Sequence, residues 1–80
     1  MKGRVRITLK RGVLDPQGKA IAQALDRLGF AGVNGVRQGK LIEIDLDEAD
    51  RDKARATLEA MCVKLLANTV IEDYAIELSE

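Results

Sequence analysis

The chain opens with an alternation of apolar and polar residues. Between residues 4 and 10, Val5, Ile7 and Leu9 occupy every second position, and basic or hydroxyl side chains fill the positions between them. A period of two residues is typical of a β-strand with one buried face. Similar alternation returns at residues 42–47, where the polar residues are acidic. It returns again within residues 70–78, toward the end of that segment. The pattern predicts three half-buried strands.

Two amphipathic helices are expected between these strands. Asp15, followed by proline, can cap the first helix, and Gly29 can end it. Asp47 or Asp50 can cap the second helix, which should end near Asn68. The apolar stripes are Ala20, Ile21, Ala24, Leu25 and Leu28 in the first helix, and Ala54, Leu58, Met61, Cys62 and Leu65 in the second.

The glycine-rich stretch before residue 40 completes the predicted order. A short strand is expected at residues 33–37, followed by a tight turn at Gln38 and Gly39. The order is then βαββαβ, within one domain that spans residues 1–80. This order predicts an α+β, ferredoxin-like fold, in which two helices cover one face of an antiparallel four-stranded sheet and the other face stays open.

Charge is divided unevenly between the two halves of the chain. The net charge is zero, yet residues 1–40 hold nine basic and two acidic residues, whereas residues 41–80 hold four basic and eleven acidic ones. In the predicted sheet the first and third strands are neighbours, so opposite charges should pair across them. The basic residues are Arg4, Arg6 and Lys10, and the acidic ones are Glu43, Asp45 and Asp47.

Composition argues against several classes of function. The chain has no histidine and one cysteine, which excludes the usual zinc sites, histidine-dependent catalysis and an internal disulfide. That cysteine, Cys62, lies in an apolar stripe and is expected to be buried and inert. Phe30 and Tyr74 are too few aromatics for a base-stacking nucleic-acid surface. No apolar run approaches the length of a membrane span, so the chain is expected in the cytoplasm.

Three blocks of the sequence resemble the PurS family, the small subunit of phosphoribosylformylglycinamidine synthase. They are Leu14–Gly18, Val36–Lys40 and Met61–Tyr74. The resemblance implies a subunit that is not catalytic alone and that bridges a glutaminase subunit and an ATP-dependent synthetase subunit in purine (IMP) biosynthesis, supporting ammonia transfer. It implies no cofactor on this chain, with ATP and magnesium on the large partner. It also implies a homo-oligomer, a dimer or a tetramer.

The same resemblance suggests which residues contact other subunits, and none is assigned a catalytic role. In the predicted fold, residues 37–40 form a hairpin tip and residues 68–74 leave the second helix. Local roles, as turn residues, caps or charged guards of a strand edge, explain some of these residues equally well. The candidates for partner contacts are Arg37, Gly39, Lys40, Asn68, Glu72 and Asp73, and those for the oligomer interface are Val70, Ile71, Tyr74, Ile76 and Leu78.

A small regulatory domain is the alternative interpretation. The segment from Asp15 to Gly18, which opens a helix after a first strand, looks like the corresponding turn of ACT domains that bind amino acids. The match has one extra residue between the proline and the glycine, and it leaves the third block unexplained. Binding of an amino acid to the isolated protein would favour this alternative.

Overall fold

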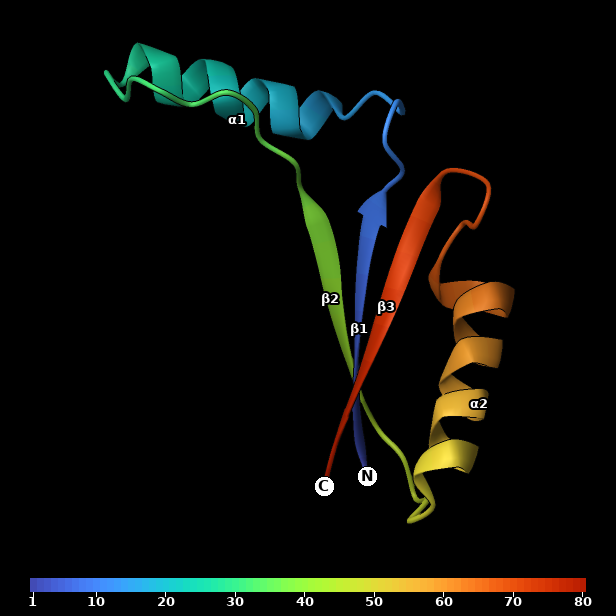
Figure 1. The fold of residues 1–80 in the computed structure, drawn as a ribbon. Coiled ribbons are helices and arrows are strands. Elements are labelled where there is room, and N and C mark those ends of the chain that lie inside the picture. Colours follow the sequence, from blue (N-terminus) through green and yellow to red (C-terminus); the bar gives the residue numbers. More distant parts are fainter.

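A three-stranded antiparallel sheet forms the body of the molecule. The computed structural model describes residues 1–80, and its strands are β1 (Lys2–Leu9), β2 (Gly39–Asp45) and β3 (Glu72–Ser79). Their order is β2-β1-β3, so β1 pairs with both neighbours (Figure 1). The three predicted alternating strands are confirmed, although β3 begins two residues later than expected.

Two helices join the strands, and both begin at predicted caps. These are α1 (Pro16–Arg27) and α2 (Arg51–Met61), and a π-helical turn, η1 (Cys62–Leu66), extends α2. The Asp15 carboxylate accepts from the backbone N–H of Gly18 at 2.9 Å, and Asp50 caps α2 in the same way. Each aspartate satisfies N–H groups that have no partner within the helix.

The core lies between α2 and the inner face of the sheet. Val5 and Ile7 are completely buried on β1, and Leu58 and Cys62 are completely buried on the helical side. Cross-strand partners share a face, so Ile42 and Ile76, which lie opposite Val5 on either side, also face α2. The core therefore consists of one helix packed on one sheet.

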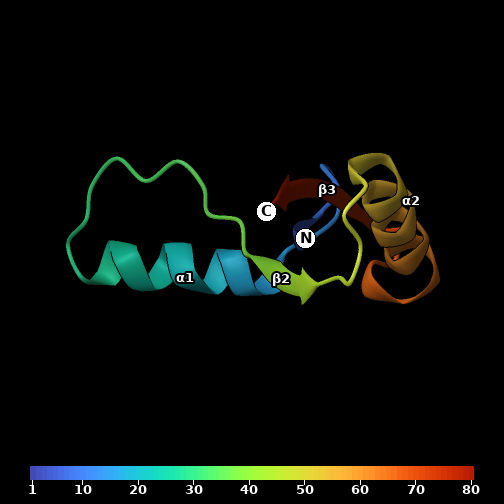
Figure 2. The same cartoon turned by 90° about the horizontal axis from the view of Figure 1, so that it is seen from below.

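Helix α1 stands away from this core. Figures 1 and 2 show it running outward from the end of β1, with residues 28–38 returning along it. We call α1 and this returning segment the arm. The radius of gyration is 16.0 Å, whereas a compact chain of this length has one of about 12 Å. The molecule is therefore elongated, with extents of 48 × 26 × 15 Å.

The predicted four-stranded sheet with two helices on one face is wrong for the single chain, although the α+β class is confirmed. Residues 33–37 form no strand, because they run alongside α1 and not beside the sheet. The outer edge of β2 is therefore unpaired. The expected hairpin at Gln38 and Gly39 is also absent, since Gly39 and Lys40 are the first residues of β2.

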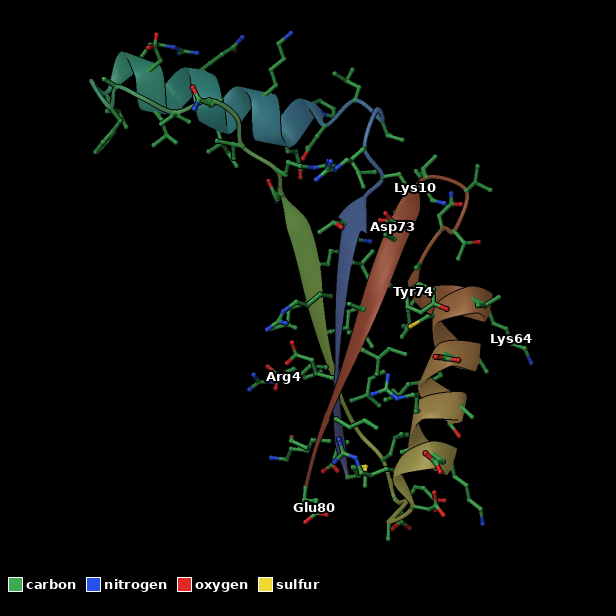
Figure 3. All side chains as sticks on the ribbon, viewed as in Figure 1. Arg4, Lys10, Lys64, Asp73, Tyr74 and Glu80 are labelled. Carbon is green, nitrogen blue, oxygen red and sulfur yellow. The ribbon has the colours of Figure 1, made fainter.

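The open face of the sheet carries only one of the predicted charge pairs between β1 and β2, because Asp45 lies opposite Lys2, and Lys10 and Asp47 lie outside the paired residues. Arg4 lies opposite Glu43 on β2, as expected, and opposite Glu77 on β3. Arg6 differs from the prediction, because Leu41 lies opposite it on β2 and its guanidinium pairs with Glu77. No helix covers this face, on which Arg4 lies between Glu43 of β2 and Glu77 of β3 (Figure 3).

Both chain ends lie at the end of the sheet far from the arm. The amino group of Met1 donates to the carbonyl oxygen of Leu46 at 2.8 Å, and Lys2 lies opposite Ser79 in the register of β1 and β3. Figure 1 shows the termini next to each other. No helix in the structure has the length and apolar character needed to cross a membrane.

Two leucines on the α2–η1 segment provide a test of the core. Leu58 is fully buried, whereas Leu65 is 83% exposed. Leu58→Ala is expected to lower the free energy of unfolding by about 2 to 5 kcal/mol, because it removes buried methyl groups and leaves a cavity. Leu65→Ala should change it by less than about 0.5 kcal/mol. Urea unfolding followed by circular dichroism measures both, and equal losses would contradict the assigned core.

Candidate interaction surfaces

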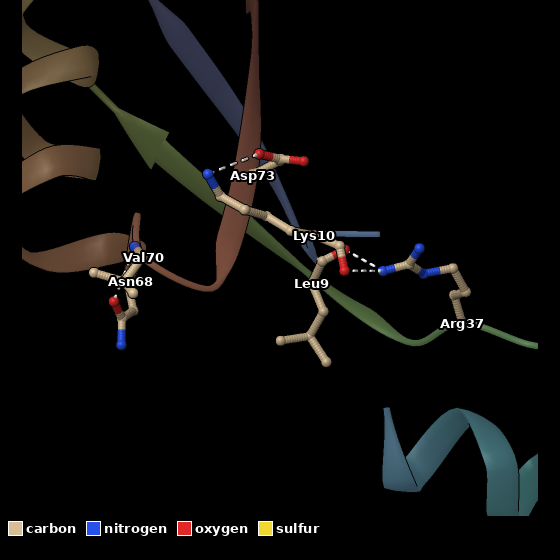
Figure 4. A network of polar contacts seen from close by, with 6 residues as sticks. All are labelled: Leu9, Lys10, Arg37, Asn68, Val70 and Asp73. Carbon is tan, nitrogen blue, oxygen red and sulfur yellow. Dashed lines mark hydrogen bonds and ion pairs between the residues drawn. The ribbon is translucent and has the colours of Figure 1, made fainter. Parts of the chain in front are cut away.

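Most of the predicted partner-contact residues gather where β1 ends. The ammonium of Lys10 lies 3.8 Å from the carboxylate of Asp73 (Figure 4), and that of Lys40 lies 3.9 Å from Glu72. Because Lys40 and Glu72 come from the strands on either side of β1, their pair spans the inner face of the sheet. We call this group the β1-end cluster; it consists of Lys10, Arg37, Lys40, Asn68, Glu72 and Asp73.

Arg37 is bound to the backbone of its own chain. Its guanidinium donates to the carbonyl oxygen of Lys10 at 3.1 Å and also to that of Leu9 (Figure 4). Both carbonyls lie just where β1 ends and the chain turns toward α1. Arg37 thus links the returning segment of the arm to the end of the central strand.

Asn68 and Glu72 form a local turn before β3. The backbone N–H of Asn68 donates to the Glu72 carboxylate at 2.7 Å, and the Asn68 side-chain oxygen accepts from the N–H of Val70 at 3.2 Å. The Glu72 side chain is 14% exposed, whereas that of Asp73 is 67% exposed. Asn68 therefore has a local role in this turn, although the predicted left-handed helix cap at this residue is wrong, because Ala67 is the C-cap and Asn68 has no positive φ. Asp73 is largely exposed.

The predicted oligomer-interface residues fall into two groups. Tyr74, Ile76 and Leu78 alternate toward α2 and are half-buried, and Tyr74 packs on the core (Figure 3). Val70 and Ile71 precede β3 and are exposed. Only this second group offers apolar side chains that the chain itself leaves uncovered.

Asp15 has a second contact that its position in the sequence does not indicate. While one carboxylate oxygen caps α1, the other accepts from the backbone N–H of Gln38 at 2.9 Å. The N–H groups of Gln38 and Gly18 and the nearby Arg37 guanidinium hold the pKa of Asp15 below its ordinary value. No local pattern reveals the contact, because it joins residues 23 positions apart.

Large exposed apolar residues lie at two separate places. One group lies on the arm, and the other surrounds η1 and the turn before β3, while Leu41 stands alone on the open face of the sheet. Groups of exposed apolar side chains mark contact surfaces more often than scattered ones do. The first group is Ile21, Leu28, Phe30 and Val33 on the arm, with Leu14 just before it, and the other group is Val63, Leu65, Val70 and Ile71.

Cys62 is buried in the core, as predicted. Desolvation raises the pKa of its thiol, and the nearby Glu59 carboxylate adds to that effect. Since the thiolate is the reactive form of cysteine, both influences disfavour nucleophilic chemistry at this position. The side chains that the structure brings together at the surface offer hydrogen bonds, ion pairs and apolar packing.

Comparisons with known proteins identify the family of the chain. The sequence pattern of the family described as PurS, phosphoribosylformylglycinamidine (FGAM) synthase, matches residues 2–80. The chain is 47% identical to the PurS subunit of this synthase from Bacillus subtilis, over 99% of this chain and 93% of that protein. It is also 47% identical to the PurS subunit from Synechocystis, over 95% of this chain and 76% of that one.

Solved structures share the fold. The crystal structure of PurS from Methanocaldococcus jannaschii superimposes with a TM-score of 0.90 at 46% identity, covering 99% of this chain and 95% of that one. A chain in the structure of PurLQS from Thermotoga maritima gives 0.86 at 28% identity, covering 95% and 93%. The family match includes the third sequence block, which the ACT-like alternative left unexplained. The chain belongs to the PurS family, the family of the small subunit of phosphoribosylformylglycinamidine synthase.

Proposed function

We propose that this chain joins a glutaminase subunit to an ATP-dependent synthetase subunit in phosphoribosylformylglycinamidine synthase and supports the transfer of ammonia between them. The observation that carries the proposal is the likeness over almost the full length to a chain of the PurLQS structure. In this proposal ATP and magnesium bind the large partner, and no cofactor binds this chain. The complex acts in purine biosynthesis, and we expect it in the cytoplasm.

The physical character of the chain supports a contact role. Its cysteine is buried, and charged residues of the β1-end cluster are engaged in backbone contacts and surface ion pairs. The β1-end cluster and the arm present charged and apolar side chains from segments far apart in the sequence. Such a mixture suits docking between proteins, where a few apolar anchors are surrounded by polar contacts.

We further propose that the chain is a homo-oligomer in which a second copy covers the arm. The exposed surface is 5997 Å², whereas a compact monomer of this mass exposes about 4,800 Å². The difference, about 1,200 Å², exceeds the roughly 800 Å² that each partner buries in a typical stable interface. The exposed apolar residues of the arm are available for such an interface.

A second copy also offers a route to the ferredoxin-like sheet expected from the element order. The outer edge of β2 has unpaired backbone groups, and residues 33–37 lie extended on the arm without a strand partner. Unpaired edges favour the addition of a strand from another chain. A segment of the second copy beside β2 would bring the sheet to four strands, and a dimer is the smallest assembly that permits it.

Enzyme reconstitution tests the bridging role. Glutamine-dependent formation of formylglycinamidine ribonucleotide by the synthetase and glutaminase subunits is expected to require this chain, because ammonia must pass between the two sites. Turnover with free ammonia should need the synthetase subunit alone. Product formation is measured with and without the chain, and light scattering measures the assembled mass. Glutamine-dependent turnover that is unchanged by omission of the chain would refute the proposal.

A matched pair of leucine variants tests self-association through the arm. Leu28 and Leu65 are 73% and 83% exposed, and only Leu28 is on the arm. The wild-type mass should be a multiple of 8.8 kDa. Leu28→Asp should lower it, because a carboxylate would have to be buried in an apolar interface. Leu65→Asp is the control and should leave the mass unchanged; the reverse result would place the interface at η1.

Two exposed lysines test the β1-end cluster as a partner surface. Lys40→Ala is expected to weaken assembly at least about tenfold, since losing one member of a desolvated charge pair costs about 2 to 5 kcal/mol. Lys64, on η1, is also exposed and serves as the control. Titration of the partner subunits, monitored by sedimentation, gives both affinities. Equal affinities for the two variants would exclude Lys40 from the interface.

A further inference from the structure

Two chain segments connect the arm to the sheet, and they run side by side. One leads from the end of β1 to the start of α1, and the other leads from the returning segment into β2. Figures 1 and 2 show that α1 touches the rest of the molecule only near these segments. We call these two connecting segments the joint. The direction of the arm therefore depends on contacts made within a few residues of the joint.

Asp15 contributes to both sides of the joint. Its carboxylate accepts the N–H of Gly18, in the first turn of α1, and the N–H of Gln38, immediately before β2, each at 2.9 Å. An N-cap requires only the first of these bonds. The second bond joins the start of the helix to the segment that enters the sheet, and so it restrains the angle between them.

Close packing at Gly18 adds a second restraint. Gly18 is the one buried residue of α1, and a Cβ added to it would lie 2.3 Å from the carbonyl oxygen of Val36. A real Cβ cannot occupy that position without moving the backbone of one segment. The glycine thus lets the first turn of α1 rest directly on the segment that returns to β2.

Arg37 ties the same returning segment to the end of β1. Its bonds to the carbonyl oxygens of Leu9 and Lys10 cross from one connection to the other (Figure 4). The joint is therefore held by a carboxylate bridge from Asp15, a guanidinium bridge from Arg37, and close backbone packing at Gly18.

We infer that Asp15 is a positioning residue, whose carboxylate bridge from Gly18 to Gln38 fixes the direction of the arm relative to the sheet. The arm and the β1-end cluster are the surfaces assigned above to other subunits, so this inference rests on the proposed function. Asp15 needs no contact with a partner to act in this way. It keeps two distant contact surfaces in one relative orientation before assembly begins.

Spin-label distances on the full chain test the restraint directly. Cysteines introduced at Gln23 on α1 and at Arg55 on α2 occupy exposed positions, and the native Cys62 is buried. Excess unlabelled protein removes distances between copies. The wild type should give one narrow distance distribution. Asp15→Asn should lose that narrow peak while keeping its helical circular dichroism. Asparagine can still cap α1 through its one oxygen, but its NH2 group, which takes the place of the second carboxylate oxygen, cannot accept the other N–H.

A second pair of variants separates the joint from helix stability. Gly18→Ala should also shift or broaden the distribution, even though alanine is the better helix former. Gln17→Ala, an exposed position in the same turn, should leave it unchanged. A distribution for Asp15→Asn that superimposes on that of the wild type would overturn the inference, as would an equal effect of Gln17→Ala.

Binding to the partner subunits is a second measurement, and a purely local role of Asp15 would leave it unchanged. Asp15→Asn should weaken binding to the partner subunits at least about tenfold, the loss that corresponds to 1.4 kcal/mol. If the distance distribution broadens and binding is unchanged, the role in assembly is wrong. If the wild type itself fails to bind the partners, the proposed function is wrong, while the distance measurement still decides whether Asp15 sets the arm.

Discussion

The pairing of β1 on both of its edges is the interaction on which the rest of the structure depends. β2 and β3 have no hydrogen bonds to each other, so the sheet exists only through the central strand. The same strand supplies Val5 and Ile7, whose side chains are fully buried beneath α2. Its last residues also provide the carbonyl groups that Arg37 binds, which connects the arm to the core.

The size of the chain explains why α1 stands apart. Eight of 80 residues are buried, and α2 already covers the apolar side of β1. An isolated helix of 12 residues is marginal in water, so α1 depends on its cap and on the segment that returns along it. The arm is therefore a secondary structure stabilised locally, with much of its apolar surface left for other molecules.

How much could be predicted from the sequence depended on the range of the interactions involved. Alternation and capping are local signals, which is why the three strands and the starts at Asp15 and Asp50 were confirmed. Residues 33–37 were predicted as a short strand before a tight turn, but a strand requires a paired edge, and the chain places these residues beside α1 instead.

The same distinction applies to the candidate surfaces. Motif resemblance selected Arg37, Lys40 and Asp73, and the structure brings them to one end of β1 from three different segments. The resemblance did not indicate the second hydrogen bond of Asp15, because a contact between residues 15 and 38 produces no signal in the local sequence around either residue. Burial of Tyr74 against α2 likewise depends on the fold rather than on alternation alone.

The adjacent termini have a consequence for how the chain can be rearranged. Lys2 and Ser79 are cross-strand neighbours, and facing Cα atoms in antiparallel strands are about 4.5 to 5.5 Å apart. A short linker could therefore close the backbone into a circle, and new ends could be opened at the tip of the arm without interrupting any strand. The order in which the strands occur along the chain is less constrained than their order in the sheet, and circular permutants can retain the same body.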